Sequence, residues 1–279
     1  MKAAEALAGR GHSVTLLERD AQLGGQVNLI VRTPGRAEFG WITSDLTVHL
    51  EKLRVNVLLS TEATVGLVAE HAPDRIIVAT GAVPDAAGIS RAAAPFAPPL
   101  TSANHGNVVT TWDVLRSTRE IGRHVVLLDD DGTRVAAGTA EVLLDAGHDV
   151  ELVTRFNTLF PGTTTTLDMP FIYERLLSKG LRYRLNSWAS HVGADSVSVV
   201  NQYTRAHDVI NGVDTVVLAT LPQPNDSLYF SLQAAFPHVQ RIGDCVAPRK
   251  LDHAIYEGFL AGLELSDHYI REGELEGIS

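Results

Sequence analysis

The chain has 279 residues, a formal net charge of −10, 45% hydrophobic residues and one cysteine. This length allows one large or two medium domains. The acidic charge, without clusters of Lys and Arg, argues against nucleic acid and against an anionic membrane surface as partners. The single Cys245 excludes an internal disulfide and an iron–sulfur cluster held by this chain alone, and no histidine spacing predicts a metal site. With no apolar run near the roughly 20 residues that span a bilayer and no signal-peptide pattern, we expect a cytoplasmic location.

The most informative stretch is residues 12–26, HSVTLLERDAQLGGQ. Residues 14–17 are typical of a short apolar strand that ends at Glu18, and residues 2–9 before it are typical of a helix. A helix followed by a strand that ends at an acid is the second half of a dinucleotide-binding βαβ unit. In such a unit the carboxylate accepts hydrogen bonds from the ribose hydroxyls of an adenine nucleotide. The first strand and its G-x-G-x-x-G turn would precede Met1.

Two glycine-containing signals follow at the ends of predicted strands. Gly24 and Gly25 stand just before Gln26, and a strand over residues 75–78 runs into Ala-Thr-Gly-Ala at 79–82. Glycines and other small residues let the backbone approach a ligand closely. Each signal alone is also compatible with a simple turn.

The remaining pattern alternates helices and strands, as in an α/β protein. A Pro- and Ala-rich stretch over 84–107 is predicted to be a linker. The expected elements are helices at 36–53 and 135–146, and strands at 55–59, 124–128, 150–154, 181–185 (an edge strand), 196–200 and 215–219.

The turn after the strand at 124–128 differs from a working nicotinamide site. Asp129, Asp130 and Asp131 precede Gly132, where a dinucleotide site would present glycines and free amides to phosphates. Repulsion between these carboxylates and phosphates predicts that NAD(P)H does not bind tightly. We interpret the aspartates as caps of the following helix.

Near the C-terminus, a strand ending at Ile242 precedes Gly243-Asp244 and a helix from about Asp252. An acid at this place can accept a hydrogen bond from a flavin's ribityl hydroxyl, or it can help to start the helix. Small residues recur along the helix, so one face is expected to lie close to another backbone or a ligand. These residues are Ala254, Gly258, Ala261 and Gly262. We interpret Cys245 as a buried structural cysteine.

In this order, the motifs resemble the C-terminal nucleotide-binding half of the trimethylamine dehydrogenase and 2,4-dienoyl-CoA reductase family. These are NADH:flavin oxidoreductases that extend an Old Yellow Enzyme barrel. The resemblance implies an α/β fold of two nested Rossmann-like dinucleotide-binding domains, as in pyridine nucleotide–disulfide reductases. The first domain would comprise residues 1–106 and 226–279, without its initial strand and glycine-rich turn. The second, with a degenerate nicotinamide site, would be the insertion at 107–225.

The resemblance also implies a set of cofactor-binding residues. They are Glu18, Arg19, Gly24, Gly25, Gln26, Ala63, Thr80, Gly81, Gly243 and Asp244. Glu18 would hold the adenosine ribose with Arg19 beside the adenine, and the Ala63 backbone would meet the adenine. Thr80 would lie near the pyrophosphate, and Asp244 would contact the ribityl chain if FAD is bound. No catalytic residue and no metal ligand are predicted.

The function expected from this resemblance is an FAD- or ADP-binding module of a flavin-dependent oxidoreductase. A separate barrel-bearing chain with FMN and an iron–sulfur cluster would complete it as a heteromer, unless the start of this chain has been cut. Two alternatives stay open at this point. One is a non-catalytic interaction subunit that has lost its nucleotide, and the other is a stand-alone NAD(P)H-dependent FAD reductase.

Overall fold

The structure is a computed structural model that describes residues 1–88, 100 and 106–276, with side chains described as far as residue 264. The predicted linker therefore lies largely outside the described residues. The chain divides into two compact units. The first comprises Met1–Asn28, Glu38–Val83 and Gln223–Ser279, and the second comprises Leu29–Ala37 and Pro84–Pro222. Among the described residues, no helix is long and apolar enough to cross a membrane.

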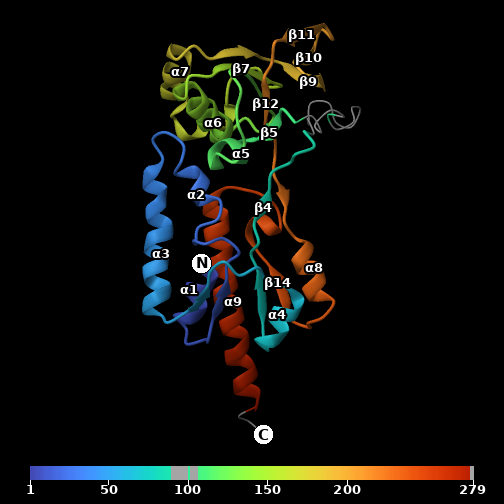
Figure 1. Ribbon diagram of the computed structural model, residues 1–279. Coiled ribbons are helices and arrows are strands. Elements are labelled where there is room, and N and C mark those ends of the chain that lie inside the picture. Colours follow the sequence, from blue (N-terminus) through green and yellow to red (C-terminus); the bar gives the residue numbers. More distant parts are fainter. Residues whose placement is uncertain (89–99, 101–105, 277–279) are drawn as a thin grey trace. The chain divides into compact units, whose positions relative to one another are not determined.

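The first unit contains three two-stranded sheets and the helices around them (Figure 1). Its strands are β1 (Thr15–Leu17) parallel to β2 (Asn56–Leu58), β3 (Ile76–Val78) parallel to β14 (Val239–Arg241), and β4 (Ala82–Val83) antiparallel to β13 (Gln223–Pro224). Its helices are α1 (Lys2–Ala8), α3 (Gly40–Lys52), α4 (Val65–Glu70), α8 (Ser227–Gln233), α9 (Leu251–Glu276) and the 3-10 turn η3 (Gly243–Cys245). The short α2 (Val27–Ile30) and the 3-10 turn η1 (Ala37–Phe39) lie where the chain passes between the units.

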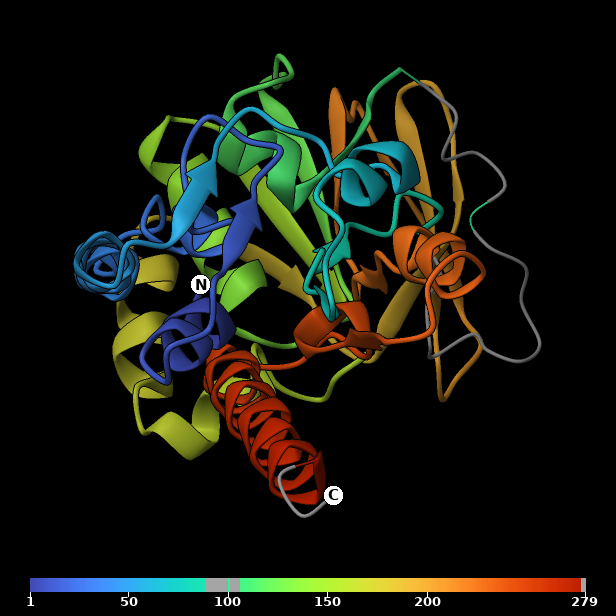
Figure 2. The same ribbon diagram turned by 90° about the horizontal axis from the view of Figure 1, so that it is seen from below.

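Helix α1 lies beside α9, and their contact depends on the small residues noted in the sequence (Figures 1 and 2). A Cβ placed on Gly262 would lie 2.4 Å from the Cβ of Ala6, and one on Gly258 would lie 3.2 Å from the backbone nitrogen of Ala3. The prediction that one face of this helix lies close to another backbone is confirmed. The backbone it meets is that of the first helix.

The second unit is built on a five-stranded parallel sheet with the order β5-β12-β6-β7-β8. The strands are β5 (Val108–Thr110), β12 (Thr215–Ala219), β6 (His124–Asp129), β7 (Asp149–Thr154) and β8 (Arg182–Arg184). An antiparallel sheet contains β9 (Ser187–Val192), β10 (Ser196–Asn201) and β11 (His207–Asn211). The helices are α5 (Thr111–Arg116), α6 (Arg134–Asp145), α7 (Met169–Ser178) and the 3-10 segment η2 (Pro161–Thr166).

Strand β6 explains why this sheet is covered on both faces. Val125 and Leu127 pack into a core with residues of α6 and α7, whereas Val126 and Leu128 pack with residues of β9, β10 and β11. Since successive side chains of a strand point to opposite faces, a continuous apolar run requires cover on each side. Helices supply that cover on one face and the three-stranded sheet supplies it on the other.

Most elements expected from the sequence are present, with ends shifted by a few residues. The strand at 181–185 is confirmed as an edge strand, since β8 ends the five-stranded order. The helix expected from residue 36 begins only at Gly40, because Ala37–Phe39 forms a 3-10 turn instead. The sequence reading missed the helices α2, α4, α5 and α8 and the strands β4, β5, β9, β11 and β13.

Candidate functional site

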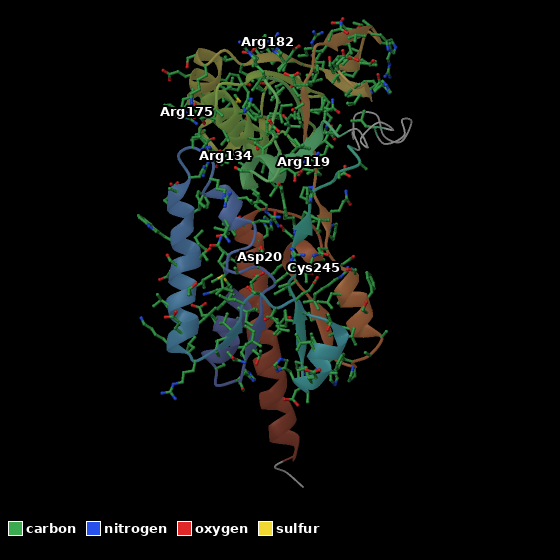
Figure 3. The ribbon with its side chains drawn as sticks, viewed as in Figure 1. Asp20, Arg119, Arg134, Arg175, Arg182 and Cys245 are labelled. Carbon is green, nitrogen blue, oxygen red and sulfur yellow. The ribbon has the colours of Figure 1, made fainter. Side chains whose placement is uncertain are left out.

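The predicted ribose-binding acid lies at the end of β1, where β1 and β2 hold it in place. The backbone nitrogen of Glu18 donates to the oxygen of Leu58 at 2.9 Å, and Thr61 donates to the backbone oxygen of Glu18 at 2.8 Å. The backbone nitrogen of Asp20 donates to Glu18 Oε1 at 2.9 Å. Asp20 is labelled in Figure 3, in the loop after β1. These bonds fix the carboxylate at the strand end, beside the loop that follows β2.

Glu18 also lies near the N-terminus of α1. Burial lowers the pKa of the Met1 amino group, while the charges of Glu18 and Glu5 act in the opposite direction. A carboxylate at a strand end and a helix N-terminus therefore meet in one place. The order of helix, strand and terminal acid expected from the sequence is present here, and the role of Glu18 at a nucleotide stays a prediction.

The Gly-Gly pair turns the chain with two positive φ angles, 115° at Gly24 and 51° at Gly25. A Cβ on Gly24 would lie 2.8 Å from Asn28 Oδ1, whereas a Cβ on Gly25 would meet nothing within 4 Å. Gly24 is thus required by packing, and Gly25 leaves open space beside the backbone. Gln26 follows directly, and its Nε2 donates to Asp244 Oδ2 at 3.0 Å.

Gly243 and Asp244 form the start of η3, after β14. Gly243 has a φ of 67°, and its N–H donates to Glu257 Oε2 on α9 at 2.7 Å. Asp244 Oδ1 accepts from the backbone nitrogen of Arg249 at 3.0 Å while Oδ2 accepts from Gln26. The Asp244 carboxylate therefore joins the Gly-Gly loop to the turn before α9.

Thr80 and Gly81 connect to the same region through Asn225. Thr80 Oγ1 donates to the backbone oxygen of Asn225 and lies 3.3 Å from Cys245 Sγ. Asn225 donates its backbone N–H to Gly81 at 3.0 Å, and a Cβ on Gly81 would lie 3.6 Å from Gln26 Nε2. Cys245 is fully buried, as predicted for a structural cysteine (Figure 3).

The structure thus brings Gln26, Gly81 and Asp244 together. Arg19 and Ala63 lie near the Glu18 end of the unit, Arg19 with its side chain 59% exposed and Ala63 half-buried in the loop after β2. Arg19 directly precedes Asp20, and Ala63 lies two residues after Thr61; Asp20 and Thr61 both donate hydrogen bonds to Glu18. Whether these groups contact a nucleotide stays a prediction.

Two residues that organise this site were missed in the sequence. Glu257 accepts from the Gly243 amide and pairs with Arg249, and Asn225 bonds to both Thr80 and Gly81. Glu257 stands directly before Gly258 in the small-residue helix, which is the one local signal that pointed to it. Asn225 carries no such signal, because its role depends on the pairing of β4 with β13.

The aspartate turn of the second unit differs from the interpretation made from the sequence. Thr133 is the N-cap of α6, and its side chain accepts from Val135. Asp129 Oδ1 instead accepts from the amides of Asp131 at 3.2 Å and Gly132 at 2.7 Å, within the turn itself. The prediction that the aspartates cap the helix is therefore wrong for Asp129. A threonine has the same capping ability and stands directly before the helix.

Other parts of the second unit cover this turn. A Cβ on Gly132, whose φ is 68°, would lie 2.5 Å from Phe156 Cε2. The backbone oxygen of Gly132 accepts from Gly162 at 2.8 Å. The face that a dinucleotide-binding turn offers to phosphates is here packed against an aromatic ring and another loop.

Asp129 itself is buried and carries an unusual pKa. Burial raises the pKa to about 7, the amides of Gly132 and Asp131 oppose the rise, and the charges of Asp131 and Asp130 add to it. No described group of three or more His, Cys, Asp or Glu residues is arranged to hold a metal ion.

Comparison with known proteins finds one matching family model and similarity to part of several longer oxidoreductases. Residues 109–216, in the second unit, match the model of the OYE-like second alpha/beta domain. The N,N-dimethylglycine/sarcosine dehydrogenase of Chromohalobacter salexigens is 29% identical over 92% of this chain and 41% of its own length. The probable N-methylproline demethylase of Rhizobium meliloti is 30% identical over 92% of this chain and 40% of its own length. This chain therefore spans about two fifths of these relatives.

Solved structures show a similar likeness. Histamine dehydrogenase from Rhizobium sp. 4-9 has a TM-score of 0.88 at 28% identity, over 95% of this chain and 42% of its own. Thioredoxin reductase from T. acidophilum has a TM-score of 0.64 at 16% identity, over 96% of this chain and 94% of its own, a likeness of fold alone. Together, the domain match and the relatives support the resemblance to the trimethylamine dehydrogenase and Old Yellow Enzyme group of flavin-dependent oxidoreductases.

Proposed function

We propose that this chain is the adenine-nucleotide module, for FAD or ADP, of a flavin-dependent oxidoreductase. The observation that carries the proposal is the hydrogen bond between Gln26 and Asp244, which lie 218 positions apart. It brings together two motifs that the family resemblance assigns to one cofactor. Glu18, fixed at the end of β1, supplies the carboxylate that a ribose requires.

The residues present fit an adenine nucleotide. Gly25 leaves open space where a side chain would stand, and Gly81 meets only the flexible end of Gln26. Glu18 Oε1 is held by the Asp20 amide, which orients the carboxylate for the hydroxyls of a ribose. Glycines for close approach and an oriented acid are what a bound nucleotide needs.

The bound nucleotide decides whether the module is a redox site. FAD would supply two-electron chemistry at its isoalloxazine ring, whereas ADP would make the site structural. In either case Glu18 holds the ribose. Gln26 and Glu257 keep Asp244 and its turn in position through the bonds described above.

We further propose that the two units are nested Rossmann-like domains and that a barrel-bearing chain with FMN and an iron–sulfur cluster completes the enzyme. The relatives, of which this chain spans about two fifths, support this division. The second unit is proposed to bind no NAD(P)H tightly. The packing of Phe156 and Gly162 against Gly132 supports that view.

The test begins with the protein as isolated. Denaturing it should release FAD or ADP, identified by absorbance and mass spectrometry. A protein that carries neither nucleotide and binds neither by calorimetry would overturn the proposal. If such a protein still forms a tight heteromer, a non-catalytic interaction subunit is the better reading. Oxidation of NAD(P)H by the chain alone would favour a stand-alone reductase.

A substitution tests the proposed role of Glu18 in binding the ribose. Replacing Glu18→Gln should weaken ADP binding about tenfold, because a neutral amide accepts a weaker hydrogen bond from the ribose than a carboxylate does. The preference for ADP over 2′-deoxy-ADP should shrink in the same variant. Glu70→Gln, at an exposed position of α4 in the same unit, is the matched control and should bind ADP like the unchanged protein.

A further inference from the structure

The second unit contains a small cavity at the carboxyl ends of β6, β7 and β12. Its volume of about 20 Å³ has room for one particle of the size of water. The polar part of its wall consists of Asp129, Asp130, Arg155, Ser187 and Thr220. The carboxyl edge of a parallel sheet is where α/β proteins bind ligands.

One carboxylate oxygen in this wall has no partner. Asp129 is only 2% exposed, and its Oδ1 accepts from two backbone amides of the turn. Its Oδ2 is buried and has no hydrogen-bond partner in the described part of the chain. Leaving a buried acceptor unpaired is costly, so the position calls for a hydrogen-bond donor.

The two hydroxyls in the wall are also acceptors toward the cavity. Ser187 Oγ donates to the backbone oxygen of Leu185 at 2.9 Å, and Thr220 Oγ1 donates to that of Asp85 at 3.0 Å. A hydroxyl has a single hydrogen, so each has only lone pairs left to offer. A molecule in the cavity that satisfies the wall must therefore donate several hydrogen bonds.

The charges in the wall point to a cation. Asp129 and Asp130 supply two negative charges when ionised, and Arg155, with Nε 2.7 Å from Asp130 Oδ1, supplies one positive charge. The excess is one negative charge. Trp188 closes the wall, but the Arg205 guanidinium already lies 5.7 Å from its ring centre, so we assign the ring no role in binding charge.

We propose that this cavity binds an ammonium ion that donates to Asp129 Oδ2 and to the hydroxyls of Ser187 and Thr220. Its single positive charge balances the excess carboxylate, and its size matches that of water. A water molecule carries no charge and donates two hydrogen bonds at most. A potassium ion carries the charge but donates none. The site is independent of the nucleotide proposed for the first unit.

Thermal unfolding of the full chain tests the proposal. At about ten times its half-saturating concentration, ammonium chloride should raise the Tm of the second unit by about 2 to 5 °C. The reference is tetramethylammonium chloride at the same ionic strength. Asp129→Asn should abolish this rise. Asp131→Asn is the matched control, because it removes the same charge from the same turn but does not line the cavity, and it should keep the rise. Ser187→Ala removes one acceptor and should weaken ammonium binding several-fold.

Nuclear magnetic resonance with ¹⁵N-labelled ammonium gives a second readout. Bound ammonium, held by hydrogen bonds to the cavity wall, should give a resonance distinct from that of free ammonium in the unchanged protein and in Asp131→Asn, and none in Asp129→Asn. An equal Tm rise with potassium chloride would overturn the assignment to ammonium. A rise that persists in Asp129→Asn, or the absence of both the rise and the resonance, would overturn the site.

Discussion

Single residues in this protein show that burial and partners, more than residue type, decide what a side chain does. Asp129, Asp130 and Asp131 are chemically identical neighbours. Asp129 is 98% buried with one unpartnered oxygen, Asp130 pairs with Arg155, and Asp131 accepts from Thr133. The sequence alone indicated a run of three acids. It did not indicate that the first of them is the one with the raised pKa and the unpartnered oxygen.

The raised pKa of Asp129 predicts a pH-dependent stability. Because the folded pKa of about 7 lies above the ordinary aspartate value of 3.8, the native state binds the proton more tightly than the unfolded chain, and stability falls as pH rises between these values. From about pH 5 to about pH 8 the free energy of unfolding should drop by about 3 kcal/mol through this group. Asp129→Asn should lose that drop when urea unfolding is measured at both pH values. An unchanged drop in the variant would show that other groups cause it.

Two ion pairs of the second unit predict a contrast between an arginine that hydrogen-bonds a buried carboxylate and one that only lies near such a carboxylate. Glu141, with its side chain 4% exposed, accepts from Arg175 at 2.9 and 3.2 Å and from Lys179 at 3.0 Å. Arg175→Met should destabilise the protein by about 1 to 3 kcal/mol, since it leaves a buried carboxylate short of donors. Arg182→Met, 3.6 Å from Glu151 and 62% exposed, should cost under about 1 kcal/mol. Both arginines are labelled in Figure 3, and urea denaturation measures both effects. Equal losses would contradict the distinction between the hydrogen-bonded and the more distant arginine.

At the scale of elements, the contact of α1 with α9 depends on the absence of side chains. Gly262→Ala should destabilise the first unit by about 1 to 3 kcal/mol, because its Cβ would lie 2.4 Å from that of Ala6. Gly66→Ala in α4 is the matched control, since nothing lies within 4 Å of the added Cβ. It should be neutral or stabilise by up to about 1 kcal/mol, as alanine favours helix over glycine. Circular dichroism of the two variants during thermal unfolding compares them directly, and a neutral Gly262→Ala would refute the close packing.

Elements that the sequence predicted correctly have long apolar runs or strong helical periodicity. Strands β6 and β12 and helix α6 are of this kind, because burial on both faces of a sheet leaves a continuous signal. The missed helices α4, α5 and α8 have only six or seven residues, too few for a periodic pattern. Helix α5 does carry a capping box from Thr110 to Asp113, a signal that the sequence reading overlooked.

The candidate site was predictable as separate motifs but not as an arrangement. Glu18 at a strand end and the glycines at 24 and 25 are local signals. The bond from Gln26 to Asp244 joins residues 218 positions apart, and no local pattern encodes it. The cover of Gly132 by Phe156 is equally non-local. The resemblance to a family supplied the grouping that the individual residues could not.

At the scale of the whole molecule, two compact units with separate cores predict separable unfolding. Differential scanning calorimetry should resolve two transitions. A nucleotide bound in the first unit should raise the midpoint temperature of one transition only, because binding stabilises the unit that holds it. Asp129→Asn should change the midpoint temperature of the other transition only. A single transition that both changes shift together would show that the units unfold as one.

The segment Leu29–Ala37 belongs to the second unit although the chain on either side of it belongs to the first. Its Arg32 donates to the backbone oxygen of Leu115 at 2.8 Å, and Thr33 occupies the space that a Cβ on Gly138 would need. During synthesis, most of the second unit leaves the ribosome before the segment Gln223–Ser279 of the first unit is made. Helix α1 must wait for α9, which it packs against, and is exposed for tens of seconds or less at about 5 to 20 residues per second. Cellular yield should thus depend more on chaperones that shield the newly made segments of the first unit than on the stability of the folded protein.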